Sequence, residues 1–372
     1  AAAEAAGPLP FEPPPRYPAR KREQLRAWCA ADSLLLEEAF RLGADPSRCL
    51  CVNDEHGALS TAFRPAGLWT DSALAALALE RNLALNHLPP VPVSWSTDTP
   101  PSGFDTVLLR VPKQLPLLEF QLATLAQLLP PGGKVLAAGM DKHLSPHTAA
   151  LLERYIGPTE RQPGRRKARL FTAVFTRPPA ADIPGSSAYD CAAAGGRLHA
   201  SPNVFSGGQL DKGSRLLLEH LGELAPVDKL IDLACGNGVL GLAALRAGLC
   251  REVTFADESA MALASARDNF VRLFPQAPRD SCQLHHGDGL VNYPGEAVEL
   301  ILCNPPFHLQ HTVDDYAGRR LLAQAADHLG AGGGLCLVAN RHLDYGDTLQ
   351  RHFARTRVLA RTSKFNLCLA TR

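Results

Sequence analysis

The sequence predicts two consecutive α/β domains, each built on a parallel, doubly wound sheet. Short apolar runs alternate with longer helical patterns along the whole chain, which is typical of βαβ units. The order of these segments repeats in the two halves. Polar or acidic residues follow several of the apolar runs, and open α/β sheets bind their ligands at the carboxyl ends of strands.

Composition limits the classes of protein that fit. The chain has 372 residues, 46% of them hydrophobic and 20% charged, enough for two or three globular domains. We find no apolar run of about 18 residues that could span a membrane, so no membrane partner is expected. Residues 1–26 carry Pro and Arg where a secretory signal would be apolar. The 10 Cys contain no Cys-x-x-Cys pair, so we expect reduced core thiols, no metal site and a cytoplasmic protein.

The first half begins with a Pro-rich, basic stretch, residues 1–27, which either contacts phosphates or is a solvated lead-in. Apolar, β-branched runs predict strands at residues 48–54, 67–71, 91–96, 105–111, 134–139 and 169–177. Ala- and Leu-rich patterns predict helices from near Leu25, after Gly57, at 72–86 and at 115–129. We place the first domain at residues 1–180.

Pro, Gly and Ser at residues 184–187 and the pair Gly195-Gly196 predict an irregular linker at 181–205. The second domain is placed at 206–372. Strands are expected at residues 229–233, 252–257, 283–286, 300–303, 334–339, 356–359 and 365–370. Helices are expected at residues 210–221, 239–247, 260–273 and 315–329.

Comparison of the halves predicts that the first copy is degenerate. We match Asp54 to Asp232, Asp71 to Asp257, and Pro112 to Pro306. The second copy has two closely spaced glycines after its first strand and ends its fourth strand in Asn-Pro-Pro-Phe. The first copy has Asn-Asp-Glu-His-Gly and Arg-Val-Pro-Lys at those places. It therefore keeps the fold without the groups that carry chemistry.

The chemistry predicted at residues 304–307 is the activation of a planar amine as a nucleophile. Such an amine shares its lone pair with a π system and attacks poorly. The side-chain oxygen of Asn304 and the main-chain carbonyl of Pro305 would hold its two hydrogens, and Phe307 would stack on its plane. The alternative is a strand-ending turn with an aromatic plug.

A cofactor site is predicted at the first three strand ends of the second half. The spacing Gly236-x-Gly238 lacks the third glycine of the dinucleotide fingerprint, which disfavours a pyrophosphate. Asp257 would accept both ribose hydroxyls, Asp288 an adenine amino group and Asp232 a methionyl amino group. This ordered set indicates S-adenosylmethionine. The remaining predicted cofactor contacts are Cys235, Asn237 and Phe205.

Residues 232–238 with 304–307 resemble class I methyltransferases that act on exocyclic or amide nitrogens. Residues 203–206, 211–215 and 304–308 together resemble the bacterial rRNA guanine-N2 methyltransferases, which have two tandem Rossmann-like domains. Residues 53–60, 257–259, 307–311 and 338–345 resemble the large-subunit enzymes of that family more than the small-subunit ones.

The resemblance implies transfer of a methyl group to N2 of one guanine in 23S rRNA, with the base presented unstacked. Asn304, Pro305 and Phe307 are then the catalytic residues. Rival acceptors are adenine N6 and a protein glutamine amide, and the non-enzyme alternative is an RNA-binding assembly factor.

RNA contacts can only be local, because the net charge is +1. Near the active strand end we select Arg215, His308 and His311. In the first domain the basic run Arg165, Arg166 and Lys167 is the best phosphate-contacting candidate, although charge runs are often only solvated surface. The sequence does not set the oligomeric state, and a monomer is the simplest expectation.

Overall fold

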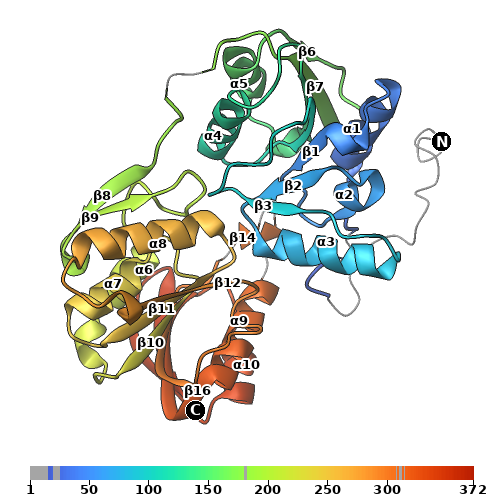
Figure 1. Cartoon of the computed structure of the whole chain (residues 1–372). Coiled ribbons are helices and arrows are strands. Elements are labelled where there is room, and N and C mark those ends of the chain that lie inside the picture. The colour runs from blue at the N-terminus through green and yellow to red at the C-terminus, as the bar shows by residue number, and fades with distance from the viewer. Residues whose placement is uncertain (1–15, 20–25, 180–181, 307, 310–311, 314) are drawn as a thin grey trace. The chain divides into compact units, whose positions relative to one another are not determined.

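The computed structural model describes residues 16–19, 26–179, 182–306, 308–309, 312–313 and 315–372. The chain divides into two compact units, residues 1–185 and 186–372. Both are α/β units with a central seven-stranded sheet (Figure 1). We describe each unit by itself.

Unit 1 has the sheet order β3-β2-β1-β4-β5-β7-β6. Its strands are β1 (Cys49–Val52), β2 (Gly67–Thr70), β3 (Val93–Trp95), β4 (Thr106–Arg110), β5 (Lys134–Met140), β6 (Thr159–Arg161) and β7 (Ala168–Val174). Its helices are α1 (Ala30–Arg41), α2 (Ala58–Phe63), α3 (Ala73–Leu85), α4 (Leu115–Leu125) and α5 (Thr148–Tyr155). Helices α1, α2 and α3 share one apolar cluster with the sheet, and α4 and α5 share another.

Unit 2 repeats this order as β12-β11-β10-β13-β16-β18-β17. Its strands are β10 (Lys229–Leu233), β11 (Glu252–Asp257), β12 (Cys282–His286), β13 (Val298–Cys303), β16 (Leu329–Asn340), β17 (Arg355–Arg361) and β18 (Phe365–Thr371). Its helices are α6 (Lys212–Glu219), α7 (Val239–Arg246), α8 (Ala260–Leu273), α9 (Asp315–His328) and α10 (Gly346–His352).

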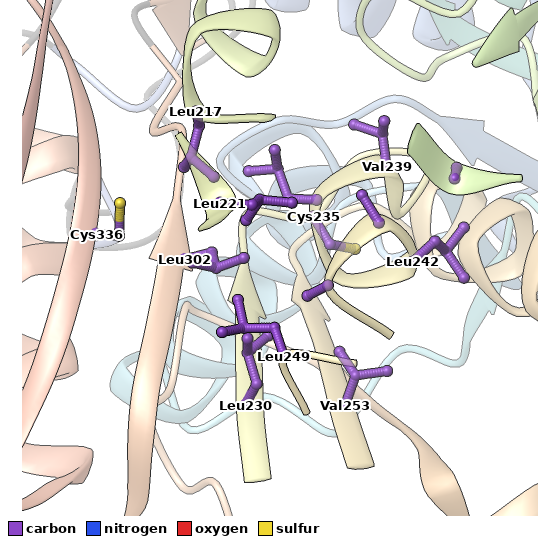
Figure 2. Close-up of a cluster of buried hydrophobic side chains, with 14 of the residues drawn as sticks. Leu217, Leu221, Leu230, Cys235, Val239, Leu242, Leu249, Val253, Leu302 and Cys336 are labelled. Atoms are coloured by element: carbon purple, nitrogen blue, oxygen red, sulfur yellow. The ribbon is translucent and has the colours of Figure 1, made fainter. Parts of the chain in front are cut away.

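Alternate residues of the unit 2 strands enter two separate cores. Leu230 and Leu302 pack with α6, α7 and α8, whereas Ile231 and Ile301 pack with α9 and α10. Figure 2 shows the first of these cores, with Leu217 and Leu221 facing strand and α7 side chains. Because both faces are covered, the strands read as continuous apolar runs.

The predicted irregular linker is wrong for most of its length. Residues 187–200 form an antiparallel hairpin, β8 (Ser187–Cys191) with β9 (Gly196–Ala200), that belongs to unit 2. Gly195, with φ of 90°, makes the left-handed turn that the hairpin needs, so glycines that indicated a linker serve a turn. The sequence also failed to predict α5, β6 and α10.

Strand register defines which residues of the two units correspond. Val52 pairs with Leu109 and Trp69 in unit 1, as Leu233 pairs with Cys303 and Ala256 in unit 2. The match of Pro112 to Pro306 is confirmed, and Arg110 corresponds to Asn304.

The register corrects the two other matches that we made by residue type. Asp54 corresponds to Cys235, and Asp71 corresponds to Glu258. Backbone conformation supports this alignment, since Gly57 and Gly238 have φ of 73° and 86° and each precedes a helix.

Candidate active site

The glycine-rich loop between β10 and α7 has one side open. Gly236 and Gly238 have φ of 54° and 86°, a region that suits glycine. A Cβ on Gly238 would lie 2.9 Å from Ala266 Cβ, so this glycine is needed for packing on α8. A Cβ on Gly236 would meet only Val204 Cγ1, at 4.0 Å. Backbone at Gly236 is therefore accessible to a ligand.

Asp257 holds this loop at the end of β11. Its Oδ2 accepts from Gly236 N at 3.0 Å, and its Oδ1 accepts from Ser259 N at 2.9 Å. The side chain is half-buried, so solvent or a ligand can reach it. A carboxylate oxygen can accept more than one hydrogen bond, so a diol could share this group with the loop.

Asp232 is bonded to the start of α7. Its side chain is fully buried, and Oδ2 accepts from Gly241 N at 2.9 Å inside the first turns of α7. Burial raises the pKa of this carboxyl well above its usual value. Asp232 Oδ2 thus fixes the helix behind the loop, whereas its Oδ1 is buried and has no hydrogen-bond partner among the described residues, so the predicted methionyl contact stays a prediction.

Asp288 forms an ion pair that the sequence did not indicate. Its two carboxylate oxygens accept from Arg320 of α9, with Oδ1 2.7 Å from Nη1 and Oδ2 2.5 Å from Nη2. Only 4% of the residue is exposed. An adenine amino group would have to share this carboxylate with Arg320, a partner that the sequence did not indicate.

Cys235 and Asn237 are tied into the protein rather than turned outward. Cys235 lies in the apolar core under the loop, and burial raises the pKa of its thiol (Figure 2). Asn237 donates to Tyr189 Oη of the hairpin at 3.1 Å, and its main-chain carbonyl accepts from Asn269 Nδ2 at 3.0 Å. Their side chains support the loop, and only their backbone is left for a ligand.

Helix α8 also fixes the segment that leads to Phe205. Asn269 bonds the backbone of His199 in both directions, at 2.9 and 2.8 Å, and Ser265 Oγ accepts from Ser201 N at 2.9 Å. Phe205 follows this anchored segment and is 72% exposed. An exposed aromatic ring beside an open backbone suits a covering role.

Asn304 is the most informative side chain of the site. It follows β13, and its Nδ2 donates to Asp211 Oδ2 at 2.8 Å and to Ser214 Oγ at 3.1 Å. Asp211 is acceptor-only when ionised, which sets the amide orientation. Asn304 Oδ1 is buried and has no hydrogen-bond partner. The site thus presents one oriented, unsatisfied acceptor.

Asp211 has a second function as the N-cap of α6, where the same Oδ2 accepts from Ser214 N at 3.0 Å. A Cβ on Gly213 would lie 3.0 Å from Asp211 Oδ2 and 3.3 Å from Asn304 Nδ2. The start of α6 is therefore packed directly against the Asn304 amide. The sequence analysis had not given Asp211 or Ser214 a role.

Other predicted contacts are only partly placed. Phe307 and His311 lie outside the described residues. His308 begins β14 (His308–Leu309), which pairs with β15 (Thr312–Val313) just beyond the buried Pro305. Arg215 is exposed on the first turn of α6.

The basic run of unit 1 lies at a tight turn, where Arg165 and Ala168 bridge. Arg166 and Lys167 have φ of 55° and 60°. Arg165 pairs with Glu37, and Arg166 Nη2 lies 3.8 Å from Glu37 Oε1. The Glu37 carboxylate thus neutralises part of the positive charge of this basic run.

Unit 1 has side chains where unit 2 is open. Glu55 stands at the position of Gly236 and Thr70 at that of Asp257. Arg110, at the position of Asn304, donates to Asp32 Oδ1 at 2.6 Å, and both side chains are largely buried. Burial raises the pKa of the Glu55 carboxyl. These substitutions remove the glycine, the carboxylate and the amide that define the unit 2 site.

The ten cysteines are free thiols, and eight of them are buried. Among the described residues, no group of three or more His, Cys, Asp or Glu side chains is arranged to hold a metal ion. No helix within that part of the chain is long and apolar enough to cross a membrane.

Comparisons with known proteins agree with this geometry. The family model of the RLMG N-terminal domain matches residues 15–177, and that of the methyltransferase small domain matches residues 195–368. Fold and site together define a class I methyltransferase that uses S-adenosylmethionine.

Curated relatives resemble the chain over nearly its full length. The ribosomal RNA large subunit methyltransferase G proteins of Alcanivorax borkumensis and Stutzerimonas stutzeri are each 41% identical and align with 94% of this chain and 92% and 94% of their own. The chain belongs to this ribosomal RNA large subunit methyltransferase G family.

A solved structure shares the two-domain fold. It is the Thermus thermophilus 16S rRNA N2 G1207 methyltransferase RsmC, in complex with AdoMet and guanosine. The TM-score is 0.74 at 21% identity, covering 92% of each chain.

Proposed function

We propose that the chain transfers a methyl group from S-adenosylmethionine to the exocyclic N2 of one guanine in 23S rRNA. The names of the relatives support the large-subunit RNA as substrate. The resemblance of residues 203–206, 211–215 and 304–308 supports guanine N2.

The observation that carries this proposal is the unsatisfied Oδ1 of Asn304. A buried acceptor without a partner costs about 1–3 kcal/mol, so it is expected to gain a donor when substrate binds. Asp211 and Ser214 hold the amide nitrogen, so the oxygen is the atom presented. It would accept one N2 hydrogen of the guanine, and the Pro305 carbonyl would accept the other. Both contacts favour the pyramidal amine over the planar one.

S-adenosylmethionine supplies an electrophilic methyl group when bound. The residues that would hold it are Gly236, through its open backbone, and Asp257, through its half-buried carboxylate. Phe205 would cover the bound molecule, and Asp288 would act together with Arg320 on the adenine side. Phe307 would stack on the guanine.

We further propose a division of labour between the units. Residues 1–180 form a degenerate copy that binds RNA, with Arg165, Arg166 and Lys167 contacting phosphates. Residues 206–372 carry catalysis, with Arg215, His308 and His311 close to the substrate. Action on ribosomal RNA supports a cytoplasmic location, and we assign a monomer.

The test is methylation of 23S rRNA purified from a strain that lacks the enzyme, followed by mass mapping of the product. Wild type should add one methyl group at a guanine N2. Asn304→Ala should lower kcat by at least about 100-fold, because an acceptor that acts in the transition state is lost, and should leave cofactor affinity within about twofold.

Asn340→Ala is the matched control, since Asn340 ends the neighbouring strand β16 and bonds only locally, to His342 N at 3.0 Å. It should retain activity. Methyl transfer to adenine or to a protein amide, or full activity of Asn304→Ala, would contradict the proposal.

A further inference from the structure

Five exposed basic side chains lie at one edge of the unit 2 sheet. We call this set the basic rim, and its members are Lys212, Arg215, Arg341, Arg361 and Lys364. Within the part of the chain that the structure describes, none of the five forms an ion pair with an acid.

Sheet register places the rim at the edge that holds Asn304. Strands β13 and β16 are parallel, with Cys303 opposite Leu337, so Asn304 and Arg341 leave the sheet on the same side. Strand β18 is antiparallel and begins there, with Phe365 opposite Asn340. Strand β17 ends there, with Arg361 opposite Asn366.

The start of α6 brings the other two cations to this edge. A Cβ on Gly213 would lie 3.0 Å from Val338 Cγ1, near the end of β16, and 3.3 Å from Asn304 Nδ2. Lys212 and Arg215 flank Gly213 in the first turn of α6. The turn of α6 that carries these two exposed cations is therefore the one packed against the Asn304 amide.

The loops that carry the rim are held by the protein itself. Arg341 N donates to the Lys364 carbonyl at 2.8 Å, and Arg341 Nη1 donates to the Thr362 carbonyl at 3.1 Å. The acid next to Lys212 is Asp211, whose Oδ2 already accepts from Ser214 N and Asn304 Nδ2. The acids closest in sequence to Arg341 are Asp344, whose Oδ1 accepts from Gly346 N at 2.9 Å, and Asp347 of α10. At the opposite edge, Lys229 pairs with Glu296 and Arg251 with Asp228, whereas Arg355 and Arg357 have no ion pair within the described residues.

We propose that the basic rim binds phosphates of the RNA strand that enters the active site. This inference rests on the proposed function, because it takes ribosomal RNA as the substrate. Unpaired exposed cations keep their charge available for phosphates, whereas paired ones are partly neutralised. The position beside Asn304 means that the same contacts would position the target guanine.

Strand β17 offers a matched test, because its two ends carry the same kind of side chain. Arg361→Gln with Lys364→Gln removes two rim cations. Arg355→Gln with Arg357→Gln removes two exposed, unpaired cations from the start of the same strand, where Arg355 lies opposite Thr371. The two variants have equal net charge, and either should keep the thermal midpoint and the S-adenosylmethionine affinity of wild type.

The measurement is the dissociation constant for a 23S rRNA fragment as a function of salt, with methyl transfer followed in parallel. Each phosphate contact contributes a slope of about 0.7 to 0.9 in log K against log salt. The rim variant lacks two cations, so the slope of its log K against log salt should be smaller by about 1.5. Over one decade of salt concentration, down to about 0.1 M, the loss of two contacts corresponds to roughly 25- to 60-fold weaker RNA binding. The control variant should bind as wild type does.

Equal weakening in both variants would show a nonspecific charge effect and overturn the basic rim. Unchanged binding of the rim variant, with methyl transfer intact in wild type, would overturn the rim and leave the proposed function standing. Tight RNA binding without methyl transfer in wild type would refute the proposed function alone. Absence of RNA binding in wild type would refute both.

Discussion

At the scale of residues, Asp211 decides which atom of Asn304 meets the substrate. Its Oδ2 accepts from both Ser214 N and Asn304 Nδ2. Unit 1 keeps an acid in a comparable place, since Asp32 near the start of α1 pairs with Arg110 at the position of Asn304. An acid at the helix start thus holds the strand-end side chain in both copies.

Two substitutions of Asp211 separate helix capping from positioning. Asn keeps the length and a side-chain oxygen, whereas Ser caps helices well but is too short to reach the amide. Asp211→Ser should lower kcat about 10- to 150-fold, as expected when a charge-assisted hydrogen bond of about 1.5–3 kcal/mol is lost. Asp211→Asn should restore most of kcat, and steady-state kinetics with rRNA should show KM for S-adenosylmethionine unchanged in both.

Ser72→Ala removes a cap of the same kind in unit 1, where Ser72 Oγ accepts from Ala75 N at 3.1 Å, and it controls for lost stability. If Asp211→Ser and Ser72→Ala changed kcat equally, Asp211 would be a cap and nothing more.

Asp257 can be tested with the residue that unit 1 uses instead. Thr70 Oγ1 accepts from Ser72 N at 3.2 Å, as Asp257 Oδ1 does from Ser259 N. Asp257→Thr should therefore preserve the start of α8 but lose acceptors for the ribose. We expect S-adenosylmethionine to bind about 10- to 150-fold more weakly, as for hydrogen bonds to a charged group of about 1.5–3 kcal/mol. Calorimetric titration measures this, and an affinity within twofold of wild type would rule out the ribose role.

At the scale of elements, one asparagine joins a helix to the loop after the first strand in each copy, and in unit 2 it also holds the hairpin. Asn82 of α3 donates to the His56 carbonyl at 2.9 Å, and Asn269 of α8 donates to the Asn237 carbonyl at 3.0 Å. These residues correspond by register and are both fully buried. Asn269 also bonds β9, whereas Asn82 Oδ1 has no partner.

Asn269→Ala should consequently lower the free energy of unfolding more than Asn82→Ala does. It leaves three buried backbone groups without their partner, for a loss on the order of 2–4 kcal/mol, against about 1–2 kcal/mol for the single bond in unit 1. Urea unfolding gives both values. Limited proteolysis should show faster cleavage between β9 and α6 only in Asn269→Ala, and equal cleavage rates would contradict the link between α8 and the hairpin.

Elements with a strong pattern were predictable from the sequence. Strands β10 and β11 and helix α8 match the expected bounds. The two strands are apolar runs with an Asp at or near their ends, and the helix begins after a Ser cap, so each carries a local signal in the sequence. The hairpin β8–β9 was missed, since its stability comes from contacts with Asn269 and Asn237 that are distant in sequence.

The candidate site, too, could be predicted only where residue type alone carries the signal. The open backbone at Gly236 and the amide at the end of β13 could be anticipated from residue type and position, whereas their contacts with cofactor and substrate stay predictions. The roles of Asp211 and Arg320 depend on which side chains the fold brings together, which no spacing along the chain reveals.

At the scale of the whole molecule, the unit boundary determines which fragment can bind the cofactor. The division falls after Gly185, so the hairpin β8–β9 belongs with the catalytic sheet. A fragment of residues 186–372 keeps every bond between the hairpin, α8 and the glycine-rich loop. A fragment of residues 206–372 lacks Tyr189 and the β9 backbone, and so leaves Asn237 and Asn269 with buried polar groups unpaired.

We therefore expect the 186–372 fragment to fold and to bind S-adenosylmethionine within about threefold of the full chain, because its cofactor contacts are internal. The 206–372 fragment should lose more than about 2 kcal/mol of unfolding free energy, from at least two unsatisfied buried groups. Urea unfolding and calorimetric titration on both fragments measure these quantities. If unit 1 is the RNA-binding copy, the 186–372 fragment should also bind 23S rRNA far more weakly than the full chain. Undiminished RNA affinity in that fragment would assign RNA binding to unit 2 and remove the role proposed for Arg165, Arg166 and Lys167.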